Sequence, residues 1–133
     1  MNRLSEIWIN TVTCENKIVL DTDVISSFAW VERFDIIIEL YSPDVIILDV
    51  VKDELIKVKH LFNIVNKYIE SEDIELIKLD INADEGLEYG RLLKDIWTVG
   101  KGEAACMAYC RYHNCILGSN FPSRAQFSMC HLE

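Results

Sequence analysis

Four carboxylates lie at positions in the sequence where a metal site for phosphate chemistry could be built. Asp21 and Asp23 directly follow an apolar run, and Glu54 and Glu103 each lie near the expected beginning of a helix. Carboxylates that converge repel one another unless a cation binds between them. A hard divalent ion such as Mg²⁺ or Mn²⁺ prefers oxygen ligands, and it can activate water and stabilise the charge of a phosphoryl transition state.

Each of these carboxylates also has a purely structural explanation. Asp21 or Asp23 could cap the helix that follows, because a side-chain oxygen there accepts a hydrogen bond from the first helical turn. Glu103 in a first helical turn is favoured by the helix dipole alone, and Glu54 could be a solvated helix residue. Of the two aspartates, we expect Asp21 to bind the metal and Asp23 to cap the helix.

The segments that would position these residues alternate between strands and helices. Short apolar runs predict strands at 17–21, 45–50 and 115–120. The segment 74–80 alternates apolar and polar residues, which predicts a strand near an edge of the sheet. Helical spacing predicts helices from about Ser26 to Tyr41, over 51–71, over 82–97 with Asn82 as a candidate N-cap, and after the glycine-rich turn that opens 99–113.

This order of segments predicts an α/β fold, a three-layer α/β/α sandwich around a central, mostly parallel sheet. Ligands of such sheets bind at the carboxyl ends of the strands. If the first and last strands are neighbours, Asp21, Glu54 and Glu103 meet at one edge of the sheet.

Length, charge and cysteine content limit the class of protein. The 133 residues predict one domain over 1–133, with 1–16 as an N-terminal extension. The formal net charge of −9 means that any nucleic-acid contact must rest on a local basic patch. The five cysteines, an odd number, indicate reduced thiols in a cytoplasmic protein. No apolar run approaches the roughly 20 residues of a membrane span, so we expect no membrane association.

Four motifs in order favour the metal site over the structural explanations. They are "IVLDTDVISSF", "VIILDVVKDEL", "GKGEAACMAYC" and "CILGSN", and they span about residues 17 to 121. Together they resemble a PIN domain, the fold of many metal-dependent ribonucleases and of the toxins in bacterial toxin–antitoxin pairs. The resemblance identifies Asp21, Glu54 and Glu103 as the catalytic acids.

The resemblance implies a mechanism and partners for these residues. Asp21, Glu54 and Glu103 would hold one or two Mg²⁺ or Mn²⁺ ions, some through water. A metal-bound water would attack an RNA phosphodiester and leave a 5′-phosphate and a 3′-hydroxyl. Thr22 and Ser119 would orient the site by hydrogen bonds, and an antitoxin or a second copy of the chain would be the protein partner. Four basic residues could guide the RNA backbone: Lys52, Lys101, Arg111 and Arg124.

The sequence departs from the family pattern in two places. Where the family carries an aspartate within two residues of "GS", this chain has Asn120 and Phe121. Asn120 can offer a carbonyl oxygen to a metal but no charge, which would weaken metal affinity or silence catalysis. The segment 122–133 is also short for the further strand that PIN domains generally contain.

Three alternatives stay open at this point. A PIN-like domain without its last acid could be a binding or assembly module that binds no divalent metal. A haloacid-dehalogenase-like phosphatase would use Asp21 as nucleophile and Asp23 as general acid, although Ile25 and the lack of a late acidic pair depart from that family. A zinc site, without the usual Cys-x₂-Cys pair, is the third alternative, and its ligands would be Cys106, Cys110, His113 and Cys115.

Overall fold

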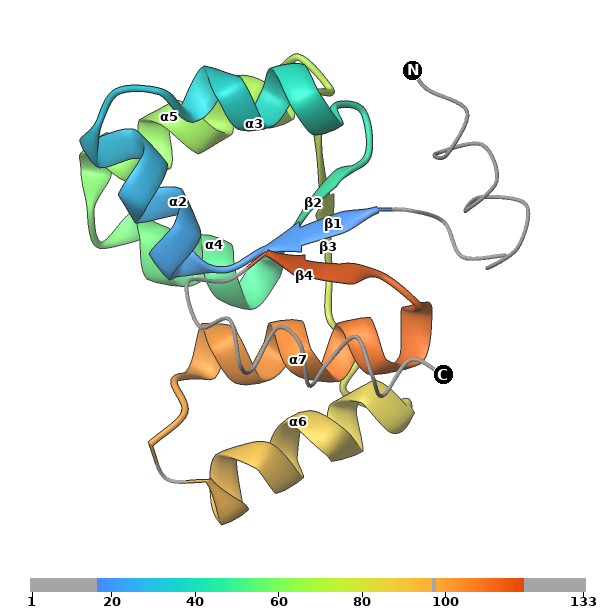
Figure 1. The fold of residues 1–133 in the computed structure, drawn as a ribbon. Coiled ribbons are helices and arrows are strands. Elements are labelled where there is room, and N and C mark those ends of the chain that lie inside the picture. Colours follow the sequence, from blue (N-terminus) through green and yellow to red (C-terminus); the bar gives the residue numbers. More distant parts are fainter. Residues whose placement is uncertain (1–16, 97, 119–133) are drawn as a thin grey trace.

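The chain folds around a four-stranded, all-parallel sheet that is flanked by helices (Figure 1). The computed structural model describes residues 17–96 and 98–118. The strands are β1 (Ile18–Leu20), β2 (Val45–Leu48), β3 (Ile74–Ile77) and β4 (Ile116–Gly118), in the order β3-β2-β1-β4. The predicted α/β fold is confirmed, with the first and last strands as neighbours and the third strand at an edge.

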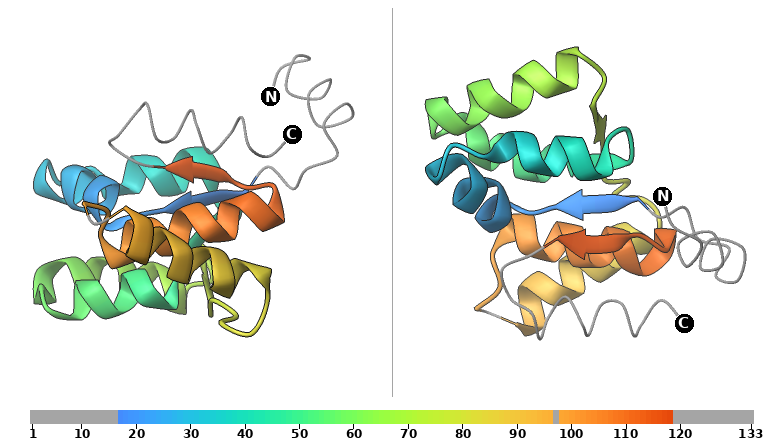
Figure 2. Two further views of the ribbon diagram at one scale, coloured as in Figure 1. Left: turned by 90° about the horizontal axis from the view of Figure 1, so that it is seen from below. Right: turned by 45° about the horizontal axis from the view of Figure 1, so that its top comes forward.

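Burial explains why these short runs form the centre of the fold. All four residues of β2 are buried, as are Val19 and Leu20 of β1. Parallel strands of this kind are covered by helices, so they contain continuous apolar runs. In Figure 1, α6 (Asp84–Asp95) and α7 (Lys101–His113) lie below β1 and β4, and α2 (Thr22–Trp30), α3 (Phe34–Tyr41) and α5 (Lys59–Glu70) lie above them. The views of Figure 2 also show α6 and α7 side by side.

The helix predicted from Ser26 to Tyr41 is two helices, α2 (Thr22–Trp30) and α3 (Phe34–Tyr41). The chain leaves α2 at Val31, and Glu32 then adopts a left-handed conformation with a φ of 58°. The apolar spacing continues through this break, because Ile25 and Ala29 of α2 and Ile37 of α3 all pack into the same core. Periodicity alone therefore conceals the break.

The helix predicted over 51–71 is also two helices, α4 (Asp49–Ile56) and α5 (Lys59–Glu70). Val58 between them is extended, with a φ of −121° and a ψ of 92°. Helix α4 begins at Asp49, so β2 ends earlier than predicted. The Asp49 Oδ1 atom accepts hydrogen bonds from the N–H groups of Val50 (2.9 Å) and Leu79 (3.0 Å), which ties this junction to the segment after β3.

The predicted N-cap of α6 is wrong. Ala83 occupies the N-cap position, and the Asn82 N–H instead donates to Asp80 Oδ1 (3.0 Å) in the turn before the helix. By contrast, the glycine-rich turn does lead into α7, with Gly100 as its N-cap residue, and Asn114 ends that helix with a φ of 55°.

Some of the sequence predictions concern residues that the structure describes, and others concern residues outside them. Cys106, Cys110 and Cys115 are buried free thiols, and no helix within 17–96 and 98–118 is long and apolar enough to cross a membrane. The positions that lie outside the described ranges are Ser119, Asn120, Arg124 and the segments 1–16 and 122–133.

Candidate functional site

The three acids that the resemblance identifies line a single pocket of about 570 Å³. We call it the acidic pocket. Asp21 follows β1, Glu54 belongs to α4, and Glu103 lies in the first turn of α7. Pairing of β1 with β2 and β4 brings the beginnings of these helices to one end of the sheet. The residues that line the pocket are Asp21, Thr22, Asp23, Glu54, Lys57, Thr98, Gly100 and Glu103.

The carboxylate of Glu54 is held by groups from two other helices. The Thr22 hydroxyl donates to Glu54 Oε1 (2.6 Å), and the Gly102 N–H donates to Oε2 (3.3 Å). A Cβ at Gly102 would lie too close to Glu54 Oε1 for a normal contact, so only glycine lets the carboxylate approach the backbone here. Thr22 therefore has the orienting contact that the resemblance implies.

The prediction that Asp23 caps the helix after the first strand is wrong. Asp21 is the N-cap of α2, and its Oδ1 accepts a hydrogen bond from the Val24 N–H (3.2 Å). Asp23 lies exposed in the first turn of the same helix. Asp21 is nevertheless only 2% exposed and still lines the acidic pocket. The cap does not test whether Asp21 also binds a metal, so metal binding by Asp21 stays a prediction.

The acidic pocket is not a ready-made metal cage. Among the described residues, no three His, Cys, Asp or Glu side chains are grouped so that they could hold a metal ion. This includes Cys106, Cys110, His113 and Cys115, so the structure gives no support to the zinc alternative. The oxygen-only donors of the acidic pocket fit a hard divalent cation by chemical type. Ion binding would require Asp21, Glu54 and Glu103 to move closer together.

The negative charge of the pocket acts on neighbouring groups. Burial raises the pKa of the Cys106 thiol well above its ordinary value, and the nearby Cys110, Asp21, Glu54 and Glu103 raise it further. Burial and the charges of Glu54 and Asp49 raise the pKa of Tyr89. Both groups therefore stay protonated at neutral pH. They do not contribute a thiolate or phenolate to this side of the fold.

Of the basic residues chosen from the sequence, Lys52, Lys101 and Arg111 do not line the acidic pocket, and Arg124 lies outside the described residues. Lys52 lies over the ring of Phe62 (5.7 Å to the centroid), and Arg111 pairs with Glu88 (3.4 Å) on the face of α6 and α7. Lys101 is exposed at the start of α7. The lysine that lines the pocket is Lys57, which sequence reasoning missed. Its signal was present, because residues three apart on a helix are neighbours and Lys57 follows Glu54 by three.

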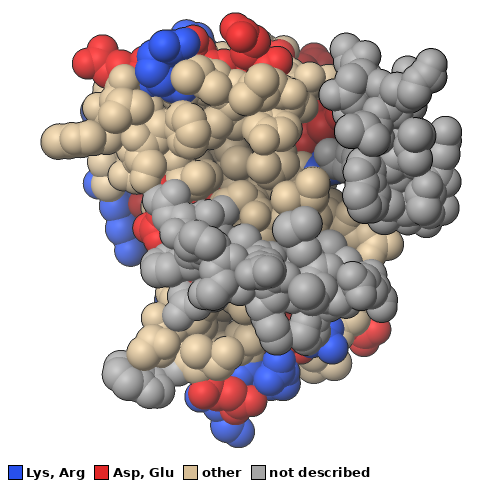
Figure 3. Space-filling view, in the orientation of Figure 1, with Lys and Arg blue, Asp and Glu red and all other residues tan. Residues whose placement is uncertain are grey.

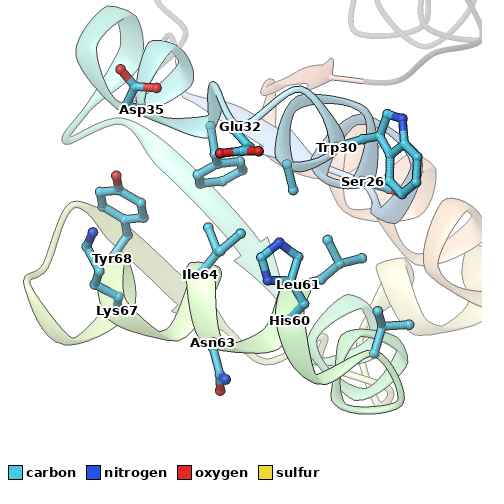
Figure 4. A pocket seen from close by; sticks show the side chains of 13 residues that line it. Ser26, Trp30, Glu32, Asp35, His60, Leu61, Asn63, Ile64, Lys67 and Tyr68 are labelled. Atoms are coloured by element: carbon cyan, nitrogen blue, oxygen red, sulfur yellow. The ribbon is translucent and has the colours of Figure 1, made fainter.

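A second, larger hollow of about 1040 Å³ lies between α2, α3 and α5 (Figure 4). Trp30 stands at one end of this groove and is 87% exposed, and Ile64 points from α5 into it. Figure 3 shows that the surface over α2 and α3 is mostly uncharged. A large apolar hollow with an exposed tryptophan is typical of a protein-binding surface.

No protein-family model matches this chain, and no curated protein is significantly similar to it. The likeness to PIN domains therefore depends on the four sequence motifs and on an α/β fold with a parallel sheet.

Proposed function

We propose that the protein is a PIN-like ribonuclease of the cytoplasm that depends on Mg²⁺ or Mn²⁺ and hydrolyses RNA phosphodiester bonds. The observation that supports this most strongly is the common pocket of Asp21, Glu54 and Glu103. These residues come from three separate sequence motifs and lie 33 and 49 positions apart along the chain.

The residues of the acidic pocket would have separate roles in this reaction. Asp21, Glu54 and Glu103 would hold the ion, with Asp23 adding negative charge at the rim of the pocket. When bound, the ion supplies an activated water and offsets the charge that develops on the phosphoryl oxygens. Thr22 and Gly102 hold the Glu54 carboxylate by hydrogen bonds, so Asp21 and Glu103 would have to move toward it for an ion to bind.

Calorimetric titration with Mn²⁺ tests the proposal on the wild type and on Asp21→Asn. Asparagine caps helices as well as aspartate does, so this variant should lose charge and keep the fold. We expect saturable binding by the wild type and at least tenfold weaker binding by Asp21→Asn, with the midpoint of urea unfolding nearly unchanged. Cleavage of a single-stranded RNA should then depend on Mn²⁺ and should be lost in Glu54→Gln and Glu103→Gln.

The Mn²⁺ titration and hydrolysis assays together distinguish the ribonuclease from a binding module and from a phosphatase. No Mn²⁺ binding by the wild type would contradict the ribonuclease and favour a binding or assembly module. Metal-dependent hydrolysis of an aryl phosphate without RNA cleavage would favour a phosphatase, because Asp21 and Asp23 both line the pocket.

We infer that the groove between α2, α3 and α5 receives an apolar segment with basic residues, as an antitoxin would provide. Ala29, Phe34 and Leu61 line the groove. Of its charged residues, Glu32 and Asp35 are negative and Lys67 is positive. A second copy of the chain carries the same net charge of −9, so it is a poorer electrostatic match. We therefore expect a monomeric mass for the isolated protein in sedimentation equilibrium. A stable dimer that Trp30→Ala dissociates would contradict this choice of partner.

A further inference from the structure

The acidic pocket contains a lysine for which the proposed chemistry has so far no use. Lys57 lines the pocket together with Asp21, Glu54 and Glu103. It is the C-cap residue of α4, and its N–H donates to the carbonyl oxygen of Glu54 (3.3 Å). The end of α4 thus places the exposed residue Lys57 in the lining of the pocket that also contains Glu54.

Lys57 is one of several lysines of the described residues without a local charge or ring partner, and of these it is the one that lines the acidic pocket. Within residues 17–96 and 98–118, its side chain forms no ion pair and no cation–π contact. Other basic side chains do have such local contacts, namely Lys17, Arg33, Lys52, Lys67, Arg91 and Arg111. The ammonium group of Lys57 is therefore available to a ligand in the pocket.

An RNA phosphodiester that enters this pocket meets four carboxylates of its own charge sign. A divalent ion offsets part of this repulsion. A lysine at the rim can offset more, because an ammonium group donates a charge-assisted hydrogen bond to a phosphate oxygen.

We propose that Lys57 binds a non-bridging phosphate oxygen of the RNA substrate in the acidic pocket and thereby positions the phosphodiester over Asp21, Glu54 and Glu103. This inference rests on the proposed ribonuclease function. It assigns the phosphate contact to one residue at the end of α4 and not to the basic residues on the outer faces of the protein.

The test compares Lys57→Gln with Lys59→Gln, a control that removes the same charge two residues further along the chain and outside the pocket. Cleavage of a labelled single-stranded RNA with Mn²⁺ gives kcat and KM, and calorimetry gives the Mn²⁺ affinity. We expect Lys57→Gln to raise KM about tenfold or more with a smaller change in kcat. The slope of log KM against log salt should fall by about 0.7, the value for one phosphate contact on a single strand. Lys57→Arg should restore most of the affinity.

Metal binding separates a phosphate contact from a structural role. Removing a positive charge near the carboxylates should leave the Mn²⁺ affinity unchanged or raise it about two- to fivefold. Parallel loss of Mn²⁺ binding and cleavage in Lys57→Gln would overturn the inference, and so would a KM within twofold of the wild type. Neither result would contradict the proposed ribonuclease function. A wild type without Mn²⁺-dependent cleavage above the Asp21→Asn background would refute the proposed function and this inference with it.

Discussion

Replacing Gly102 with alanine is expected to lower metal-dependent RNA cleavage by about 100-fold while the protein stays folded. The new Cβ would overlap Glu54 Oε1, which is the mobile end of a side chain, so the carboxylate and not the backbone should give way. Glu54 would then lose its contacts with Thr22 and the Gly102 N–H. A misplacement of about 1 Å in a catalytic group can cost this much in rate. Steady-state cleavage with Mn²⁺ and urea unfolding measure the two effects.

Gly90→Ala is the matched control for this variant. Gly90 also lies in a helix, and a Cβ there would meet no atom within 4 Å. Alanine should therefore leave cleavage unchanged and raise the free energy of unfolding by about 0.5–1 kcal/mol through helix propensity. If Gly102→Ala cleaves RNA like the wild type, the fixed position of Glu54 is not needed for the reaction.

Replacing Gly86 with alanine is expected to have the opposite outcome, a large loss of stability. A Cβ at Gly86 would overlap the carbonyl group and Cα of Ile81, which are backbone atoms in the turn before α6. Backbone cannot rotate away as a side chain can, so the turn or the start of the helix must shift. Overpacking of this kind typically costs about 1–3 kcal/mol, and occasionally more. We expect a loss of about 2 kcal/mol or more, measured as a lower midpoint of urea unfolding.

Gly90→Ala is also the control for Gly86→Ala, because it places the same methyl group four residues later in the same helix. The two substitutions should change the free energy of unfolding in opposite directions. Equal stability of Gly86→Ala and the wild type would show that the turn over residues 80–83 accommodates the methyl group without cost.

Local pattern was sufficient to predict the type and order of the secondary structure. The strands are short apolar runs, and in a parallel sheet with covered faces such runs have few other environments. The helix breaks at Glu32 and Val58 were not predictable from periodicity, because the apolar residues keep their spacing on both sides of each break. Each break depends on how two helices pack against the sheet, which spacing along the chain does not encode.

The sequence by itself determined which residue types could form a site. Four motifs in order pointed to Asp21, Glu54 and Glu103, and the approximate positions of the strands could be read around them. It did not determine their contacts. The cap on α2 belongs to Asp21 and not to Asp23, because the backbone of Asp21 is extended there and Thr22 begins the helix.

Only the tertiary structure decided what surrounds Glu54. Its carboxylate meets Thr22 from 32 positions away and Gly102 from 48 positions away. It also shares its pocket with Lys57, which no motif singled out. These contacts exist because parallel pairing of β1 with β2 and β4 brings the starts of α2 and α7 against α4. Strand order is a property of the whole chain, so the environment of the Glu54 side chain is not encoded in the residues next to it.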